Sequence, residues 1–92
     1  MNDAATFCLR AGAASWRDVE QELVILDLES GVYFTLNGSA RTLWLALDTG
    51  STLEGLCELL TEGYGIERER ASADVAAFLI DLENRGFIEQ AS

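Results

Sequence analysis

Residues 15–36 carry three short apolar segments of the kind that form strands. "SWRDV" at 15–19, "ELVILDL" at 22–28 and "VYFTL" at 32–36 are rich in β-branched, aromatic and aliphatic residues. Glu29, Ser30 and Gly31 separate the last two, and glycine supplies the positive φ that a hairpin turn needs. The sequence therefore predicts a three-stranded antiparallel sheet whose third strand comes last and is a candidate edge.

Side-chain alternation assigns the two faces of this sheet. Asp27 shares one face of the second strand with Leu23 and Ile25, and its charge suggests that this face is the wetter one, which leaves Leu23, Ile25 and Tyr33 as a partly exposed apolar strip. Half-burial under the N-terminal segment is the simplest explanation of that strip. The predicted core set of the sheet lies on the opposite face and comprises Val24, Leu26, Leu28, Val32, Phe34 and Leu36.

After Leu36 the apolar positions recur at helical spacing. Asn37 or Ser39 can cap a first helix that ends near Asp48–Gly50, with an apolar stripe of Ala40, Leu43, Trp44 and Leu47. Ser51 and Glu54 have the spacing of a capping box and predict the start of a second helix. Its apolar face comprises Leu53, Leu56, Cys57 and Leu60, with Tyr64 as a further candidate, and Gly63 and Gly65 end it.

A third helix is predicted from Glu67 or Ser72 to Arg85. Gly86 follows as the residue after its C-terminal cap, and Phe87 or Ile88 can fold back onto the last turn. The buried stripe comprises Val75, Phe78, Leu79 and Leu82. The predicted class is α+β with the order β-β-β-α-α-α, a helix-turn-helix core preceded by a wing-like sheet. Residues 1–14 are expected to be a flexible N-terminal arm and residues 15–92 a single domain.

Composition and charge narrow the function classes. The 92 residues include six arginines, no lysine and sixteen acidic residues, for a net charge of −10, which disfavours nucleic acid and anionic membranes as partners. The chain has no histidine, and Cys8 and Cys57 lie too far apart for a zinc motif, so no metal and no cofactor are expected. With no lysine for covalent chemistry either, we do not expect an enzyme. No apolar run long enough for a membrane span and no secretory signal are visible, which predicts a cytoplasmic protein.

Several motifs in order along the chain resemble one family. They are Leu26-Asp27, "SGVYFTLN" at 30–37, Trp44 in the first helix, and "DVAAFLIDLENRGFI" at 74–88. In this order and spacing they are similar to the PqqD-like family, also called RiPP recognition elements after the ribosomally made, post-translationally modified peptides they serve. The resemblance covers about residues 15–89, and it makes residues 15–92 a PqqD-like peptide-recognition domain of winged helix-turn-helix type.

The resemblance implies a chaperone or adaptor that binds the leader segment of a precursor peptide. The leader would add as a strand beside the third strand, next to the third helix, while a separate modifying enzyme (a radical SAM protein or a leader peptidase) acts on the rest of the precursor. Phe34 and Phe78 are also candidates for the core, and Asp81 and Arg85 have the spacing of an i, i+4 ion pair. The candidate peptide-binding residues are Val32, Tyr33, Phe34, Thr35, Leu36, Asp74, Ala77, Phe78, Asp81 and Arg85.

Two alternatives stay open from sequence. A winged-helix regulator would bind DNA, although the third helix is net negative, with Arg68, Arg70 and Arg85 against five acidic residues between Glu67 and Glu83. An adaptor could instead bind a partner enzyme directly without holding a leader. The precursor and the modifying enzyme are encoded elsewhere. The oligomeric state stays open, because an exposed edge strand can also pair with the same strand of a second copy.

Overall fold

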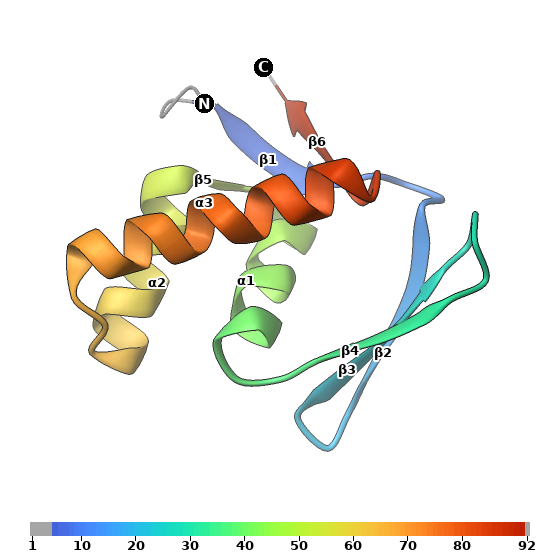
Figure 1. Cartoon of the computed structure of the whole chain (residues 1–92), viewed down its shortest axis with the longest axis horizontal. Helices are drawn as coiled ribbons and strands as arrows, with labels where there is room; N and C mark the ends of the chain where they lie inside the picture. The colour runs from blue at the N-terminus through green and yellow to red at the C-terminus, as the bar shows by residue number, and fades with distance from the viewer. Residues whose placement is uncertain (1–4, 92) are drawn as a thin grey trace.

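The computed structural model describes residues 5–91, which form three helices and six strands (Figure 1). The strands are β1 (Thr6–Leu9), β2 (Ala14–Val19), β3 (Glu22–Asp27), β4 (Tyr33–Leu36), β5 (Ser51–Thr52) and β6 (Ile88–Ala91). The helices are α1 (Gly38–Thr49), α2 (Leu53–Tyr64) and α3 (Arg68–Asn84). The predicted α+β class, with a three-stranded sheet followed by three helices, is confirmed. A second three-stranded sheet, which the sequence did not predict, is added to it.

The predicted sheet has the order β2-β3-β4, with both pairs antiparallel. A two-residue turn joins β2 to β3, and both of its residues, Glu20 and Gln21, have positive φ (52° and 68°), as the tightest hairpin turns require. The five residues 28–32 join β3 to β4, and Gly31 has a φ of 76°. Because β4 is last in the order and pairs only with β3 among the described residues, it is an edge strand, as the sequence suggested.

The predicted core face of β3 is wrong. Leu23 and Ile25 are 0% and 1% exposed, whereas Leu28 and Val32 are 51% and 49% exposed and Val24 and Leu26 are half-buried. The register explains the difference, because Leu23 lies opposite Leu36 and Ile25 opposite Phe34, so these four side chains share the inner face. Asp27 lies on that face too, but it is at the end of the strand. There its carboxylate accepts the N–H groups of Glu29 and Ser30 in the following turn.

The predicted flexible arm is also corrected where the structure describes it. Residues 1–4 lie outside the described residues, but Thr6–Leu9 form β1, the central strand of a sheet with the order β5-β1-β6. Phe7 is 1% exposed, and Ala14 already belongs to β2. No local pattern predicts this sheet, because β1 pairs with residues that lie more than forty positions away, at Ser51 and at Gln90.

The helices follow the predicted apolar stripes, with one change of cap. Thr52, not Ser51, caps α2, and its hydroxyl accepts the N–H of Gly55 at 3.0 Å. Ser51 is taken up by β5, where it pairs with Phe7. Helix α1 has Asn37 at its N-cap position and Gly50 at its C-cap. Helix α3 starts at Arg68 after Glu67, the earlier of the two predicted starts.

The end of α3 turns the chain back into the core. The N–H of Gly86 donates to the carbonyl of Glu83 (3.0 Å) and the N–H of Phe87 to that of Leu82 (3.0 Å), which is the Schellman arrangement. Gly86 has a φ of 78°, and the predicted fold-back places Phe87 and Ile88 at 3% and 4% exposed. Both residues thereby join the core.

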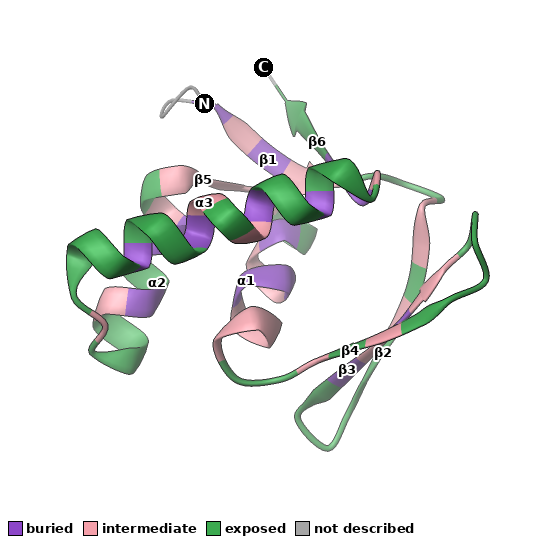
Figure 2. Cartoon of the chain, viewed as in Figure 1, coloured by how far each residue is buried: buried purple, intermediate pink, exposed green. Residues whose placement is uncertain are grey.

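One hydrophobic core connects both sheets and all three helices (Figure 2). Trp44 of α1 lies near its centre, with edge-to-face contacts to Trp16 of β2 (6.2 Å between ring centroids) and to Phe87 (5.7 Å). The β2-β3-β4 sheet is thereby joined to the helices through aromatic side chains. Within residues 5–91, no helix has the length and apolar character needed to cross a membrane.

Candidate functional site

Among residues 5–91, one row of backbone groups on strand β4 has no strand partner. The N–H of Asp27 donates to the carbonyl of Val32 at 2.9 Å. In an antiparallel pair, residues turn toward and away from the neighbouring strand in alternation, so Phe34 and Leu36 bond to β3. The N–H and C=O groups of Tyr33 and Thr35 therefore point to the open edge of the sheet. Such an edge can accept a further strand.

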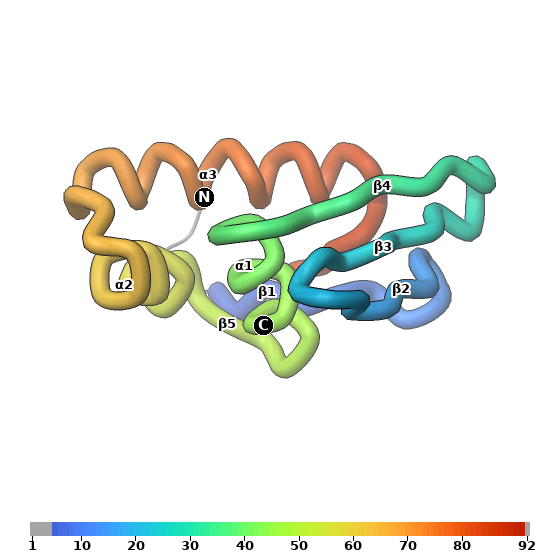
Figure 3. Tube along the Cα trace, turned by 90° about the horizontal axis from the view of Figure 1, so that it is seen from below, coloured from blue at the N-terminus to red at the C-terminus, as the bar shows by residue number. Residues whose placement is uncertain are grey.

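The open edge of β4 faces α3 across a groove. In Figure 3, α3 runs on the β4 side of the sheet, with β3 and β2 lying successively farther from it. A cavity of about 160 Å³ lies between them, with Thr35 and Phe34 on the strand side and Phe78, Asp81 and Arg85 on the helix side. Its remaining walls are apolar or aromatic and comprise Ile25, Leu36, Trp44, Leu82 and Phe87. This is a narrow apolar groove with a charged rim.

The groove continues along α3 into a wider hollow of about 400 Å³. Phe78 and Asp81 line both spaces, and the hollow adds Asp74 and Ala77 from α3. Its other side is formed by the start of α1, at Ser39, Ala40 and Leu43. Eight of the ten predicted peptide-binding residues thus line two adjoining spaces: Phe34, Thr35, Leu36, Asp74, Ala77, Phe78, Asp81 and Arg85.

The other two predicted site residues do not line this groove. Val32 precedes β4 and is 49% exposed. The Tyr33 side chain is 66% exposed and borders a different hollow, on the outer face of the sheet with Val24 and Leu26. Strand alternation explains this, because Tyr33 and Phe34 point to opposite faces. Tyr33 can contribute its backbone to the edge but not its side chain to the groove.

Arg85 spans the end of the groove from α3 to β4. Its guanidinium lies 4.3 Å from the centre of the Phe34 ring, a cation–π contact. Its Nε also donates to both carboxylate oxygens of Asp81, at 3.3 and 3.2 Å. The predicted i, i+4 pair is therefore confirmed. Asp74 faces Arg70 in a longer contact of 3.7 Å.

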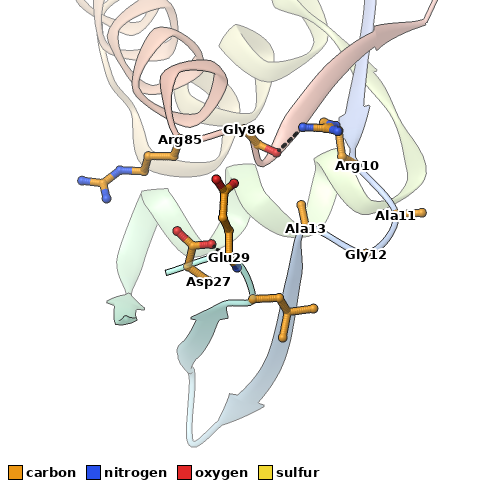
Figure 4. Close-up of a pocket in the computed structure, with 9 residues that line it drawn as sticks. Arg10, Ala11, Gly12, Ala13, Asp27, Glu29, Arg85 and Gly86 are labelled. Atoms are coloured by element: carbon orange, nitrogen blue, oxygen red, sulfur yellow. Dashed lines mark hydrogen bonds between the residues drawn. The ribbon is translucent and has the colours of Figure 1, made fainter. Parts of the chain in front are cut away.

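A second pocket of about 270 Å³ begins where the groove ends, and Arg85 lines both (Figure 4). Arg10 lies on its far side and donates to the carbonyl of Gly86 at 3.2 Å. Asp27 also lines this pocket, and its carboxylate accepts the N–H groups of Glu29 (3.0 Å) and Ser30 (3.4 Å). Partial burial raises the pKa of Asp27, but these hydrogen bonds and the nearby Arg85 hold it below its ordinary value. The pocket is electrically balanced, since Glu29 also lines it.

Sequence reasoning missed Trp44, Leu82 and Phe87 as walls of the groove. All three were assigned to the core or to the end of α3, and no local signal separates a core side chain from one that also borders a cavity. Within residues 5–91, no group of three or more Cys, Asp or Glu side chains is placed to hold a metal ion. The chemistry this site offers is the binding of an extended, partly apolar segment.

A family model and solved structures of other proteins are similar to this chain over most of its length. The family described as "Coenzyme PQQ synthesis protein D (PqqD)" matches residues 22–88. A solved structure described as "TbiB1 in Complex with the TbiA(beta) Leader Peptide" is similar with a TM-score of 0.81 and 25% identity, over 92% of this chain and 98% of that one. Another, "Lasso peptide synthetase B1 complexed with the leader peptide", has a TM-score of 0.78 and 31% identity, over 90% and 96%. The comparison with curated proteins gives no match.

Proposed function

This chain belongs to the PqqD family, and we propose that it binds the leader segment of a ribosomally made precursor peptide without performing chemistry itself. The two solved structures named above are described as complexes with leader peptides. The observation that carries the proposal is the open edge of β4 beside an apolar groove. A separate modifying enzyme, a radical SAM protein or a leader peptidase, would then act on the precursor while the leader is held.

In this proposal the leader adds as a fourth strand next to β4. Tyr33 and Thr35 offer two N–H and two C=O groups, and four hydrogen bonds contribute about 2–6 kcal/mol net. Micromolar affinity needs about 8 kcal/mol, and ordering a flexible leader opposes binding. The main chain alone is therefore insufficient, and side chains of the leader must bury apolar surface in the groove.

Strand geometry specifies which leader side chains do so. Alternate residues of the added strand would share the inner face with Phe34 and Leu36 and enter the groove. The residues between them would lie on the outer face with Tyr33. We therefore expect leaders with apolar residues at i and i+2. A basic residue that reaches α3 would meet Asp74 or Asp81 at the rim.

Strand addition can be tested at Thr35 without disturbing the β3–β4 pairing. In Thr35→Pro the outward N–H is replaced by a ring, and proline is tolerated on an edge strand where its position faces outward. We expect the leader affinity to fall by at least about tenfold, since hydrogen bonds are lost and the ring obstructs the added strand. Calorimetric titration measures the affinity, with synthetic peptides as probes: the TbiA(beta) leader and the N-terminal segment of any precursor peptide found encoded beside this chain's gene.

Thr35→Ala is the matched control, because it changes the same side chain but keeps the N–H. It should bind within about threefold of the wild type. Equal affinities of the proline and alanine variants, with both folded by circular dichroism, would rule out strand addition at β4. If the wild type bound neither peptide, leader binding itself would be contradicted, and an adaptor that contacts only the enzyme would be favoured.

A further inference from the structure

Trp44 carries a polar atom for which the fold provides no partner. The residue is 1% exposed, and its indole Nε1 is the fully buried side-chain nitrogen that lacks an acceptor among residues 5–91. Its two ring neighbours, Trp16 and Phe87, contact it edge to face and offer no acceptor in their side chains. Buried donors without partners are rare in folded proteins because each one costs free energy. An unsatisfied group of this kind at a binding site calls for an explanation.

The position of Trp44 supplies an explanation for its unsatisfied donor. The residue lines the groove between β4 and α3, where the other walls are mostly hydrocarbon or aromatic. The charged groups at the rim are already engaged, since Arg85 binds Asp81 and lies over Phe34. The ring of Trp44 therefore borders a cavity that is otherwise apolar, while its Nε1 is fully buried in the free protein. A leader oxygen can reach this unused donor only if the ring or its neighbours shift when the leader binds.

We propose that the indole N–H of Trp44 is a recognition group for the leader and donates a hydrogen bond to a neutral side-chain oxygen that the leader inserts into the groove. This inference rests on the proposed leader binding. It adds a specificity determinant: an inward-facing leader residue with a hydroxyl or a primary amide.

Two physical arguments fix the class of acceptor. The carbonyls of an added strand lie in the plane of the sheet and point along the hydrogen-bonding direction, so a groove wall on the inner face is met by side chains. A carboxylate is disfavoured, because burying a charge in an apolar cavity is costly and Asp81 lies at the same rim. A hydroxyl or amide oxygen can accept the bond without either penalty.

Nuclear magnetic resonance of the full chain, with ¹⁵N-labelled indoles, tests the inference directly. The chain has two tryptophans, so Trp16 provides an internal reference. The probes are again the TbiA(beta) leader and the N-terminal segment of any such neighbouring precursor. On saturation we expect the Trp44 indole proton to move downfield and to exchange more slowly with solvent, while the Trp16 indole proton moves much less.

Two tryptophan variants provide the binding measurement. Trp44→Phe keeps an aromatic ring but removes the donor, and we expect the leader to bind about threefold to tenfold more weakly. Trp16→Phe is the matched control and should bind within about twofold of the wild type. Thermal melts of both variants establish that they are folded, and the wild-type indole signal does not depend on either.

The outcomes separate this inference from the proposed function. If the amides of Tyr33 and Thr35 shift on titration but the Trp44 indole does not, leader binding stands and the role of Trp44 is overturned. If neither responds to either peptide, leader binding itself fails. Single alanine replacements along the leader locate the acceptor, and an indole shift that survives all of them would assign it to a main-chain carbonyl and overturn the side-chain assignment.

Discussion

At the scale of single residues, two of the three acidic side chains in the β2-β3-β4 sheet lie on its inner face, so a charge in a strand does not by itself mark the face exposed to water. Asp27 points to the inner side, where it accepts the N–H groups of the following turn. Asp18 also lies on that side, opposite Leu23 in the register, and forms a two-pronged ion pair with Arg41 of α1. An acidic side chain in a strand can therefore lie on the inner face of the sheet when a neighbouring element supplies its ion-pair or hydrogen-bond partner.

The Asp18–Arg41 pair gives a prediction about acid stability. The hydrogen bond from Arg41 outweighs desolvation and holds the pKa of Asp18 below its ordinary value of 3.8. A lowered folded-state pKa stabilises the fold above the ordinary value, and the contribution is lost as pH falls through the folded-state value. We therefore expect Asp18→Asn to lower the melting temperature at neutral pH and to converge with the wild type well below pH 3.8.

The difference between variant and wild type is the quantity to measure, because the whole chain also loses negative charge in acid. Asp48→Asn is the control. It removes the same charge from α1, and Asp48 forms no ion pair with any residue from 5 to 91. If the difference in melting temperature between Asp18→Asn and the wild type stays constant from neutral pH to strong acid, the ion-pair explanation is contradicted.

At the scale of elements, the end of α3 decides how the groove is built. The Schellman turn at Gly86 reverses the chain so that Phe87 packs against Phe34 of β4 (5.9 Å between centroids) and against Trp44. The same turn leaves Arg85 as the last residue before the reversal, where it reaches over Phe34. The helix end thus positions both the floor and the rim of the groove.

Gly86→Ala tests this turn. The φ of 78° is unfavourable for a residue with a Cβ and costs about 1–2 kcal/mol, which lowers the melting temperature by several degrees in a domain of this size. The added Cβ itself would only touch the end of the Arg10 side chain, at 3.4 Å, so backbone strain dominates. Thermal unfolding followed by circular dichroism measures the change.

Gly63→Ala provides the opposite expectation in the same chain. Gly63 lies within α2, and a Cβ there meets nothing within 4 Å. Alanine should therefore stabilise the protein by up to about 1 kcal/mol through its higher helix propensity. Equal melting temperatures for Gly86→Ala and the wild type would mean that the turn is not strained by a side chain.

At the scale of the whole molecule, the chain that carries the proposed leader site has a net charge of −10. Asp74 and Asp81 belong to this charge and lie along the groove and its adjoining hollow. A leader with basic residues would be attracted both by the overall field and by these carboxylates. The charge that disfavours nucleic acid as a partner therefore suits a basic peptide.

Salt dependence tests this electrostatic contribution. Because salt screens attraction between exposed charges, the leader affinity should fall as the salt concentration rises. Asp74→Asn should bind more weakly at low salt and show a shallower dependence, since one attracting charge is removed. Titrations at several salt concentrations measure both slopes. An affinity that is independent of salt would leave the charge with a role in solubility alone.

Local sequence patterns are sufficient to predict three of the six described strands and all three helices. Alternation and a glycine-bearing turn define β2, β3 and β4, and apolar stripes with caps define α1, α2 and α3, because both depend on residues within a few positions of each other. The same patterns, through a family resemblance, singled out β4 and α3, and eight of the ten predicted site residues line the groove and its hollow.

Features that depend on contacts between distant residues become visible only in the folded chain. The β5-β1-β6 sheet joins residues from both ends and the middle of the chain, so no local window contains its signal. The buried face of β3 follows from its register with β4. Asp18 of β2 can lie opposite the buried Leu23 because Arg41 of α1 pairs with its charge. The Trp44 indole, which has no hydrogen-bond partner among residues 5–91, becomes apparent only in the folded chain, where Trp16 of β2 and Phe87 after α3 pack against it, because a missing hydrogen bond depends on all the surroundings of an atom.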